Sequence, residues 1–560
     1  MVPVSTGTVG DQVASCNPFT TFDRVELGDR MVARCAAFQP PGSHRNSRTQ
    51  ASGMLHVLGS ASHATAVNRR EVMRAGGLVA LGLTWADLLR LRSLQAARPS
   101  NASFGRAKRV LLLYLQGAAS QLETWDPKPD ASAEVRGKWG ATSTSVPGIQ
   151  ICDQLPKLAR MVDRMTIVRS MSHDYNNHSN AYTLTGHPTV DFSSETNPTD
   201  ARHHPFFASV LDYLADQRVV SGEASLGQRE VPRNMGLPFR FSTYSPVFRR
   251  AGPYGAFLGD GYDPVWTEFH GEPTRTVNRV SFFNQLKGLD VEDPFCGVTA
   301  ASRLRVSDDV RLRSAMTLDR LDGRRSLVEQ LETEQRRLGA SAAAKGLDRF
   351  QQMALSLMSS RKLREALDVG REPISLREQY GMTLFGQAVL TGRRLLEAGV
   401  ELVSVFWDEY KVVNTAWDTH FNHFSRLGDE LLPGFDAAVS TLLNDLEQRG
   451  MLDDTLLLCL TEHGRTPAVK AKKKQGTSGR DHWSKAYSVM LAGAGIQEGL
   501  AYGASDGKAA FVKDRPVNPE DVLATAYHLM GVDPATTIPD RLARPVPLVA
   551  SGGVVEELLS

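Results

Sequence analysis

The stretch Thr455-Leu-Leu-Leu-Cys-Leu460, followed at once by Thr461-Glu-His-Gly464, decides the fold class of this chain. Its first part is a continuous apolar run with the length of a strand that is buried on both faces. Its second part places an acid and a histidine directly after that strand. Because open α/β sheets bind ligands at the carboxyl ends of their strands, this junction predicts a core strand and a candidate site together.

Further apolar runs predict the rest of the sheet, namely Val110–Leu115, Thr166–Val168, Glu401–Phe406 and Tyr487–Leu491. Helical patterns alternate with them: an apolar face repeats from Phe435 to Leu446, and Asn518-Pro519 is a typical helix start. Strands that alternate with helices predict an α/β core. Polar clusters follow the strands, at Gln116-Gly117, Arg169–His173 and Trp407–Glu409, and so converge on one edge.

The domain plan is read from composition along the chain of 560 residues. We predict one domain over 107–550, with an irregular insertion over the Gly-, Pro- and Arg-rich stretch 190–300 and a helical insertion over the charged stretch 307–368. Residues 1–66 are rich in small and polar residues without apolar periodicity, so we expect them to be disordered.

Residues 67–100 have the pattern of an export signal. Arg69-Arg70 precedes a mildly apolar run, Leu78–Leu89, and then small residues near Ala97, which is typical of a twin-arginine export signal. The alternative is a basic amphipathic helix. The run is too short for a membrane span, and no other segment is a candidate for one. We therefore expect export by the twin-arginine machinery to the periplasm or cell envelope, without an integral membrane span.

Charge and cysteine content exclude several classes of protein. The net charge is +2, from 64 basic and 62 acidic residues, which gives no reason to expect nucleic acid as a partner. The basic run Lys470–Lys474 fits a solvated loop. The five cysteines form no C-x-x-C pair, so neither a cysteine zinc site nor a disulfide scaffold is expected.

Candidate metal ligands lie beside the predicted strands. Asp418 and His420 are two residues apart, so in an extended segment they share a face and can bind one ion.

Glu462 and His463 stand at the end of a strand, where Gly464 permits a tight turn that lets both coordinate. His482 directly precedes the run Tyr487–Leu491. Each of these groups alone also fits a structural role, but together they favour metal. Of the other histidines, His423 is a reserve candidate, and we interpret His203, His204 and His528 as structural.

These motifs together resemble the alkaline phosphatase superfamily. More closely, the chain resembles an uncharacterised bacterial family of exported sulfatase-like proteins, the domain of unknown function numbered 1501. The resemblance spans about 66–550 and rests on Arg69–Glu71, Gln116–Pro129, Trp417–His420, Glu462–Pro467 and Gly479–Trp483.

The resemblance implies a mostly parallel sheet flanked by helices and two divalent ions, of zinc, calcium or manganese. Asp418, His420 and His482 would serve one ion. Glu462 and His463 would serve the other, completed by Asp126 or Glu123. The superfamily commonly has an Asp directly after its first strand, and Gln116 stands there in this chain.

The segment Ser172–Gly186 resembles the nucleophile helix of the superfamily. Relatives attack with the residue ten positions before the closing glycine, which here is Asn176, whose amide is no such nucleophile. Ser179 and Thr183 are the neighbouring hydroxyls. His173 and His178 would bind ester oxygens or act as acid and base, or else only support the helix.

The leading hypothesis is a metal-dependent hydrolase of a phosphate or sulfate ester, acting outside the cytoplasm on an anionic small molecule or polysaccharide. The chain lacks Cys-x-Pro-x-Arg, which argues against an ordinary formylglycine sulfatase. The alternative is a non-catalytic exported protein that binds metal or serves the envelope on the same fold.

Overall fold

The computed structural model describes residues 103–188, 192–198, 200, 202–223, 230–246, 249–280, 288–306, 360–412, 414–473 and 476–560. The N-terminal extension over 1–66 and the signal segment over 67–100 lie outside these residues, as does most of the helical insertion over 307–368. The part of that insertion that is described contains a helix, α10 (Arg361–Leu367). None of the described helices is both long enough and apolar enough to cross a membrane.

A nine-stranded sheet lies at the centre. Its strands, in spatial order, are β17 (Leu500–Tyr502), β4 (Thr166–Met171), β16 (Tyr487–Ala492), β11 (Thr455–Leu460), β1 (Arg109–Leu115), β10 (Leu402–Trp407), β5 (Asn234–Leu237), β6 (Val265–His270) and β9 (Arg303–Val306). Each of the five predicted runs is one of these strands. Only the pairs made by β16 with its two neighbours and by β6 with β9 are antiparallel within this sheet, so the prediction of a mostly parallel sheet is confirmed.

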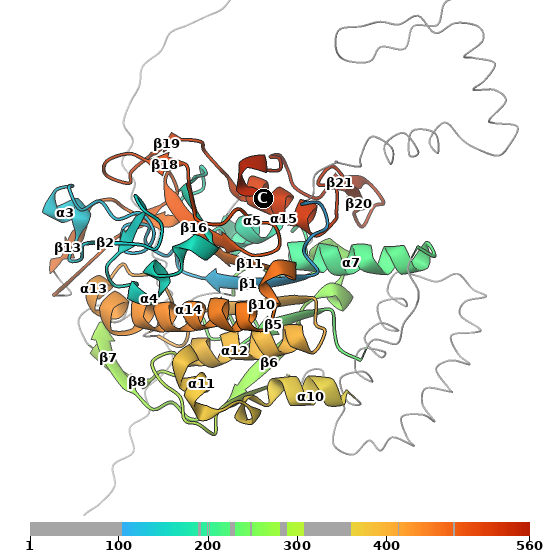
Figure 1. Cartoon of the computed structure of the whole chain (residues 1–560), viewed down its shortest axis with the longest axis horizontal. Helices are drawn as coiled ribbons and strands as arrows, with labels where there is room; N and C mark the ends of the chain where they lie inside the picture. Colours follow the sequence, from blue (N-terminus) through green and yellow to red (C-terminus); the bar gives the residue numbers. More distant parts are fainter. Residues whose placement is uncertain are drawn as a thin grey trace, which may run out of the picture. The chain divides into compact units, whose positions relative to one another are not determined.

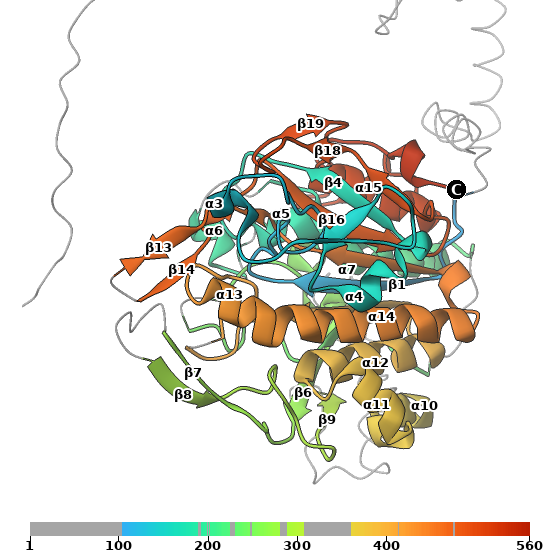
Figure 2. The ribbon, with the colours of Figure 1, turned by 60° about the vertical axis from the view of Figure 1, so that its left-hand side comes forward.

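Helices cover both faces of the sheet because alternate side chains of its strands are apolar on both faces. In β1, Leu111 and Leu113 enter one hydrophobic core, whereas Leu112 and Tyr114 enter the other. The first core is closed by α12 (Leu384–Glu397) and α14 (Leu432–Gln448), and the second by α5 (Asn180–Thr185), α7 (Phe207–Val220) and α15 (Pro519–Leu529) (Figures 1 and 2). Each buried leucine stabilises this arrangement by about 1.5–3 kcal/mol.

The predicted helices have the expected ends. α14 contains the whole apolar face from Phe435 to Leu446. At the start of α15, the side chain of Asn518 accepts a hydrogen bond from the backbone N–H of Asp521 at 3.0 Å, and Asp521 reciprocates. This capping box confirms Asn518 as the N-cap.

The stretch 190–300 differs from the expected irregular insertion. It contains α7 and two strands of the central sheet, β5 and β6. β5 has only four residues and includes Asn234 and Gly236, types that are depleted in strands. Parallel pairing with β10 therefore overrides the local preference of this segment.

The described chain also contains shorter helices and strands. The helices are α3 (Ala133–Arg136), α4 (Pro156–Ala159), α6 (Phe192–Glu195), α11 (Ile374–Tyr380) and α13 (His423–Arg426). The strand pairs are β2 (Ala141–Ser143) with β3 (Gln150–Cys152), β7 (Thr276–Val280) with β8 (Gly288–Glu292), β12 (Gly464–Arg465) with β15 (His482–Trp483), β13 (Lys470–Lys472) with β14 (Thr477–Gly479), β18 (Ala504–Ser505) with β19 (Val512–Asp514) and β20 (Thr537–Pro539) with β21 (Pro545–Pro547).

Candidate metal centre

The candidate site lies at the carboxyl edge of the parallel strands. Gln116, Asp408, Glu462 and Ser172 follow shortly after β1, β10, β11 and β4, whose carboxyl ends share this edge. β16 runs in the opposite direction, so its amino end lies here too. That reversal explains why His482, which precedes a strand, can join residues that follow strands.

Two glycines let the segment that carries Asp418 and His420 lie against its neighbouring loops. Gly117 has φ +101°, and a Cβ on it would lie 2.3 Å from the backbone nitrogen of Asp418. A Cβ on Gly479 would lie 1.9 Å from the carbonyl oxygen of His420. A larger residue at either position would therefore displace this segment.

Asp418, His420 and His482 form a first group of side chains that can hold a metal ion. The Nε2 atom of His420 lies 3.3 Å from Oδ1 of Asp418 and 3.0 Å from Nε2 of His482. The third side of this triangle, from His482 Nε2 to Asp418 Oδ1, is 3.5 Å. Ligand atoms about 2.0–2.1 Å from a tetrahedral ion lie about 3.3 Å apart, so these three atoms have the spacing of metal ligands.

Asp481 orients His420. Its Oδ1 lies 2.8 Å from Nδ1 of His420, and because a carboxylate only accepts, that nitrogen carries the proton and Nε2 keeps its lone pair. Lys470 and Lys472 of β13 donate to the same carboxylate at 2.8 and 2.9 Å. Burial raises the pKa of Asp481, but these hydrogen bonds lower it overall and keep the carboxylate ionised.

His178, His463 and His482 form a second group. Nδ1 of His463 donates to the carbonyl of Gly464 at 2.8 Å, so Nε2 bears the lone pair. That Nε2 atom is buried and has no hydrogen-bond partner among the described residues. Glu462 orients the ring of His178, because its Oε1 lies 2.7 Å from Nδ1 of that ring.

Burial keeps three of these imidazoles in the neutral form that binds metals. Desolvation is the main cause that lowers the pKa of His420, that of His463, and that of His482 to about 3. Neutral imidazole is the ligand form of histidine.

Both acids at the centre are held ionised. Burial alone would raise the pKa of Asp418, but His420, Arg465 and His178 hold it well below its usual range. The buried guanidinium of Arg465 donates to Asp418 Oδ1 and to the carbonyls of Gly117 and Ala118. For Glu462, burial is again outweighed, here by the hydrogen bond and charge of His178, and its pKa is lowered.

The structure thus brings Asp418, His420, Glu462, His463 and His482 together at one edge, as expected from the sequence. We call the two groups of possible ligands, Asp418, His420, His482, His463 and His178, the candidate centre. His178, expected as an acid or base, is a member of it, whereas Glu462 contacts it through His178.

Asp126 is not part of the candidate centre. Its Oδ1 accepts a hydrogen bond from Lys128 at 2.8 Å and its Oδ2 one from Ser505, so both oxygens have protein partners. Glu123, the alternative to it, lies in a separate buried group, the Glu123 cluster, which consists of Glu123, Ser120, His423 and Arg480. The reserve candidate His423 therefore belongs to this cluster instead.

His173 also differs from its expected role. Its Nδ1 accepts from the backbone N–H of Tyr175 at 3.1 Å, so Nε2 carries the proton and donates to the carbonyl of Glu462 at 2.7 Å. Both ring nitrogens serve the protein, which makes His173 a support for the turn after β11.

Ser179 is the N-cap of α5, and its side chain is fully buried. Its Oγ has no hydrogen-bond partner within the described chain. Asn176, which the resemblance aligns with a nucleophile position, accepts a hydrogen bond from the backbone of Ser484 at 3.0 Å. The histidines interpreted as structural have protein contacts: His203 with Ser194, His528 with Ser103, and His204 stacked on His187.

Sequence reasoning assigned no role to Asp481 and Arg465. Both lie inside the quoted motifs, directly beside His482 and after Gly464, so their position next to expected ligands was the available signal. Their partners, His420 and Asp418, are remote in the sequence and could not be assigned from it.

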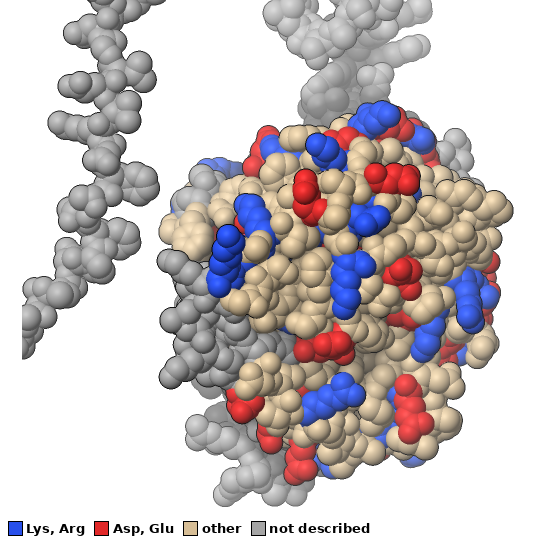
Figure 3. Space-filling model, turned by 90° about the vertical axis from the view of Figure 1, so that its left-hand side faces the viewer, with Lys and Arg blue, Asp and Glu red and all other residues tan. Residues whose placement is uncertain are grey.

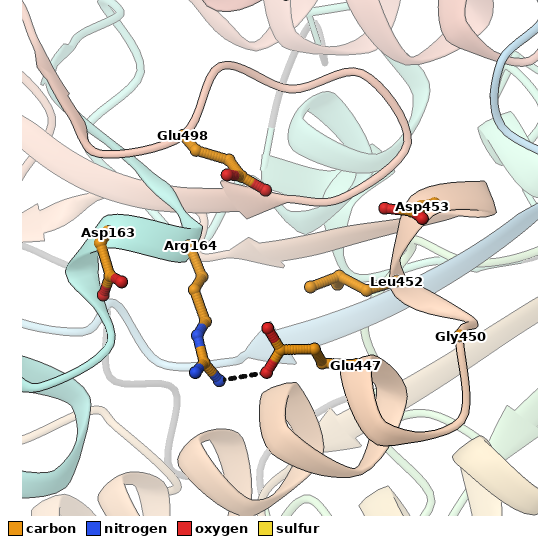
Figure 4. Close-up of a pocket in the computed structure, with 7 residues that line it drawn as sticks. All are labelled: Asp163, Arg164, Glu447, Gly450, Leu452, Asp453 and Glu498. Carbon is orange, nitrogen blue, oxygen red and sulfur yellow. Dashed lines mark ion pairs between the residues drawn. The ribbon is translucent and has the colours of Figure 1, made fainter.

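A polar hollow of about 280 Å³ lies elsewhere, lined by Asp163, Arg164, Glu447, Gly450, Leu452, Asp453 and Glu498 (Figure 4). These residues precede β4, β11 and β17 or end α14, so the hollow lies at the amino edge of the parallel strands. It contains an Arg164–Glu447 ion pair of 2.6 Å and is separate from the candidate centre. On the face shown in Figure 3, basic and acidic side chains are interspersed, as expected from the near-neutral net charge.

Comparisons with solved structures find weak similarity. One is Ps i-CgsB in complex with k-i-k-neocarrahexaose, with 11% identity, a TM-score of 0.33 and coverage of 76% of this chain and 72% of that one. The PsFucS1 sulfatase from Pseudoalteromonas sp. has 12% identity, a TM-score of 0.32 and coverage of 84% and 75%. The phosphonate monoester hydrolase of Agrobacterium radiobacter has 13% identity, a TM-score of 0.32 and coverage of 80% and 77%.

A comparison with curated proteins finds no match. A family model described as "Protein of unknown function (DUF1501)" matches residues 107–559, which include every member of the candidate centre. The chain therefore belongs to the DUF1501 family.

Proposed function

We propose that this chain is a metal-dependent hydrolase of a phosphate or sulfate ester. The observation that carries the proposal is the triangle of Asp418, His420 and His482, whose ligand atoms lie 3.0 to 3.5 Å apart. An ionised carboxylate and two neutral imidazoles leave a tetrahedral ion one open position, which is typical of catalytic rather than structural zinc.

The residues support one ion instead of the two expected from the resemblance. A neutral imidazole offers a single lone pair, so His482 can complete the first group or the second, but not both at once. We assign the ion to Asp418, His420 and His482. This donor set favours zinc or manganese over calcium, which takes oxygen ligands. When bound, such an ion would polarise an ester oxygen and stabilise the charge that develops on it.

His178 is the side chain that we propose moves the proton. Burial and the charge of Arg250 lower its pKa, but the carboxylates of Asp418 and Glu462 outweigh them and raise it. A protonated imidazole next to the three assigned ligands can give its proton to the leaving oxygen of an ester. Glu462, at 2.7 Å from Nδ1, holds the ring in place for that transfer.

Two attacking groups remain candidates, the hydroxyl of Ser179 and a water molecule. Ser179 adjoins His178 in the chain, and its buried Oγ has no partner in the described structure. A Ser179→Ala variant separates the two: attack by the hydroxyl requires a loss of kcat of at least about 100-fold, whereas attack by water leaves kcat nearly unchanged.

The test combines metal analysis with an ester panel. Purified full-length chain is loaded with zinc or manganese, analysed for metal and assayed on chromogenic phosphate monoesters, phosphate diesters and sulfate esters. We expect one ion per chain and turnover of at least one ester class, both lost in His420→Ala. A Glu447→Gln variant, altered in the remote hollow, is the matched control. Bound metal at wild-type level in His420→Ala would contradict the assignment.

One observation favours a second candidate function, a non-catalytic metal-binding protein. Asn176 stands where relatives carry their nucleophile, and its side chain is engaged by the backbone of Ser484. This alternative predicts one bound ion without turnover of any ester in the panel, an outcome that the same experiment would reveal.

We further propose that the protein acts outside the cytoplasm on anionic small-molecule or polysaccharide esters. The twin-arginine pattern in 67–100 supports export. A reporter fused to residues 1–106 should reach the periplasm of cells with a working twin-arginine exporter. Arg69→Lys combined with Arg70→Lys should stop it, and continued export of that variant would contradict this part of the proposal.

A further inference from the structure

We propose that Arg250 binds the anionic group of the ester beside the candidate centre and that Glu409 holds Arg250 in position. This inference rests on the proposed function, because it names a subsite of the same centre. The ligand class is a tetrahedral oxyanion, a sulfate or phosphate group.

Two consecutive acids after β10 hold Arg250. Its Nη2 donates to Oε1 of Glu409 at 3.2 Å, with side chains only 10% and 3% exposed. The preceding acid, Asp408, accepts from the backbone N–H of Ser242 at 2.6 Å, and the hydroxyl of Ser242 accepts from the backbone N–H of Arg250 at 3.1 Å. Side chain and backbone of Arg250 are therefore both fixed at the end of one strand.

That strand end lies in line with the candidate centre. β10 pairs with β1, and β1 pairs with β11, so Glu409, Gln116 and Glu462 follow three adjacent parallel strands. Neighbouring strands are about 4.8 Å apart, which places the ends of β10 and β11 about 10 Å from each other. The electrostatics agree, because the carboxylates of Asp418 and Glu462 help Glu409 to raise the pKa of Arg250 against the effect of burial.

Buried polar atoms without partners gather along this row. They are Nε of Arg250, Oε2 of Glu409 and both amide atoms of Gln116, and none of them has a hydrogen-bond partner in the part of the chain that is described. Buried donors normally find partners, so the two donors among these atoms, Nε of Arg250 and the amide nitrogen of Gln116, indicate a ligand that accepts hydrogen bonds.

The chemistry of these groups selects an oxyanion. A guanidinium presents donors in a planar fork that matches two oxygens of a phosphate or sulfate, and the Gln116 amide adds one more donor. Glu409 occupies one end of the fork and leaves Nε available. Arg250 can thus contact the oxygens of an ester whose leaving group is next to His178.

The test measures binding of inorganic phosphate and of sulfate to the zinc-loaded full chain by isothermal titration. Arg250→Lys keeps the charge but removes the fork, and the double variant Arg250→Met with Glu409→Gln removes the ion pair without leaving a lone buried charge. Arg233→Lys is the control, since Arg233 is also buried in ion pairs but lies just before β5, at the opposite edge.

We expect both Arg250 variants to bind the preferred anion at least tenfold more weakly than wild type while they retain one zinc ion, with Arg233→Lys unchanged. Wild-type affinity in Arg250→Lys would overturn the proposal, and so would metal-loaded wild type that binds neither anion. Should the double variant not fold, Arg250→Lys alone decides. If the proposed function itself is wrong, the result is different: wild-type protein then binds no metal.

Discussion

Two buried clusters use the same residue types, yet they differ in how their possible ligand atoms are arranged. In the Glu123 cluster, Arg480 donates to Glu123 at 3.0 Å and to the carbonyl of Val135 at 2.9 Å. His423 is held there by Thr419 at 2.8 Å and by Glu123 at 3.3 Å. The protein itself therefore supplies the counter-charges of that cluster, although Nε2 of His423 makes no hydrogen bond among the described residues.

In the candidate centre, ligand atoms from three residues lie close together in each group. Two Nε2 atoms, from His420 and His482, face each other at 3.0 Å, and Nε2 of His463 has no hydrogen-bond partner among the described residues. Arg480 and His482 are two residues apart in the chain but belong to different clusters. The comparison teaches that convergence of three ligand atoms, and not residue type, separates a possible ligand set from a structural ion-pair network.

The sharpest way to break this comparison is to remove one histidine from each cluster. His482→Ala removes the imidazole common to both groups of the centre, so zinc affinity should fall about 1,000-fold, which corresponds to about 4 kcal/mol. His423→Ala should leave zinc affinity within about twofold, although it destabilises the fold. Competition with a zinc-binding dye measures both, and equal losses in the two variants would erase the distinction.

The Glu123 cluster should instead determine acid stability. Burial raises the pKa of Glu123, but Arg480 and His423 outweigh it and lower the pKa to about 2. A carboxyl with a lowered folded-state pKa contributes stability above its unfolded pKa, near 4.5, and loses it as the pH falls towards 2. This contribution is about 3 kcal/mol.

Urea unfolding at pH 7, 4 and 3 tests this expectation. Glu123→Gln should be less stable than wild type by about 3 kcal/mol at pH 7, and the difference should shrink on acidification. Its zinc content at pH 7 should match wild type. A stability difference that is independent of pH would show that Glu123 is not ionised in its pair.

A smaller effect is expected for the carboxylate that orients His420. Asp481→Asn keeps the shape but gives a weaker acceptor for Nδ1–H, so zinc affinity should fall about 10- to 100-fold. Asp163→Asn, in the hollow of Figure 4, is the matched control and should change nothing. Unchanged affinity in Asp481→Asn would mean that Asp481 serves only the lysines of β13.

The smallest effect should come from the hollow itself. The Arg164–Glu447 pair is 2.6 Å long, but its side chains are 30% and 50% exposed, and such surface pairs contribute about 0–1 kcal/mol. Glu447→Gln should therefore leave stability within that range and anion binding unchanged. A marked loss of anion binding would instead place the anion site at the amino edge of the sheet.

The fold was largely predictable because its central strands are buried on both faces. Runs such as Thr455–Leu460 are apolar at nearly every position, because all of their residues are buried. Asn518 predicts a helix start because its side chain can cap the first turn. β5 was missed because its four residues, with Asn234 and Gly236, acquire their strand conformation from pairing with β10.

The site was predictable only in part. Asp418 and His420 lie in the loop between β10 and α13, whereas Glu462, His463 and His482 stand beside strands, so that the convergence of these three follows from the topology. Their roles do not, because a role depends on which atom is already satisfied. Asp126 was expected to act at the site, but it accepts hydrogen bonds from Lys128 and Ser505. His173 was also expected to act there, but its ring nitrogens bond to the backbone of Tyr175 and Glu462.

The most direct measurement is the metal content of purified full-length protein by elemental analysis, for wild type and for Asp418→Ala with His420→Ala. We predict one zinc or manganese ion per wild-type chain and less than about a tenth of that in the double variant, with an unchanged circular dichroism spectrum. Wild type that binds no divalent metal, or a folded double variant that binds as much as wild type, would contradict the metal centre.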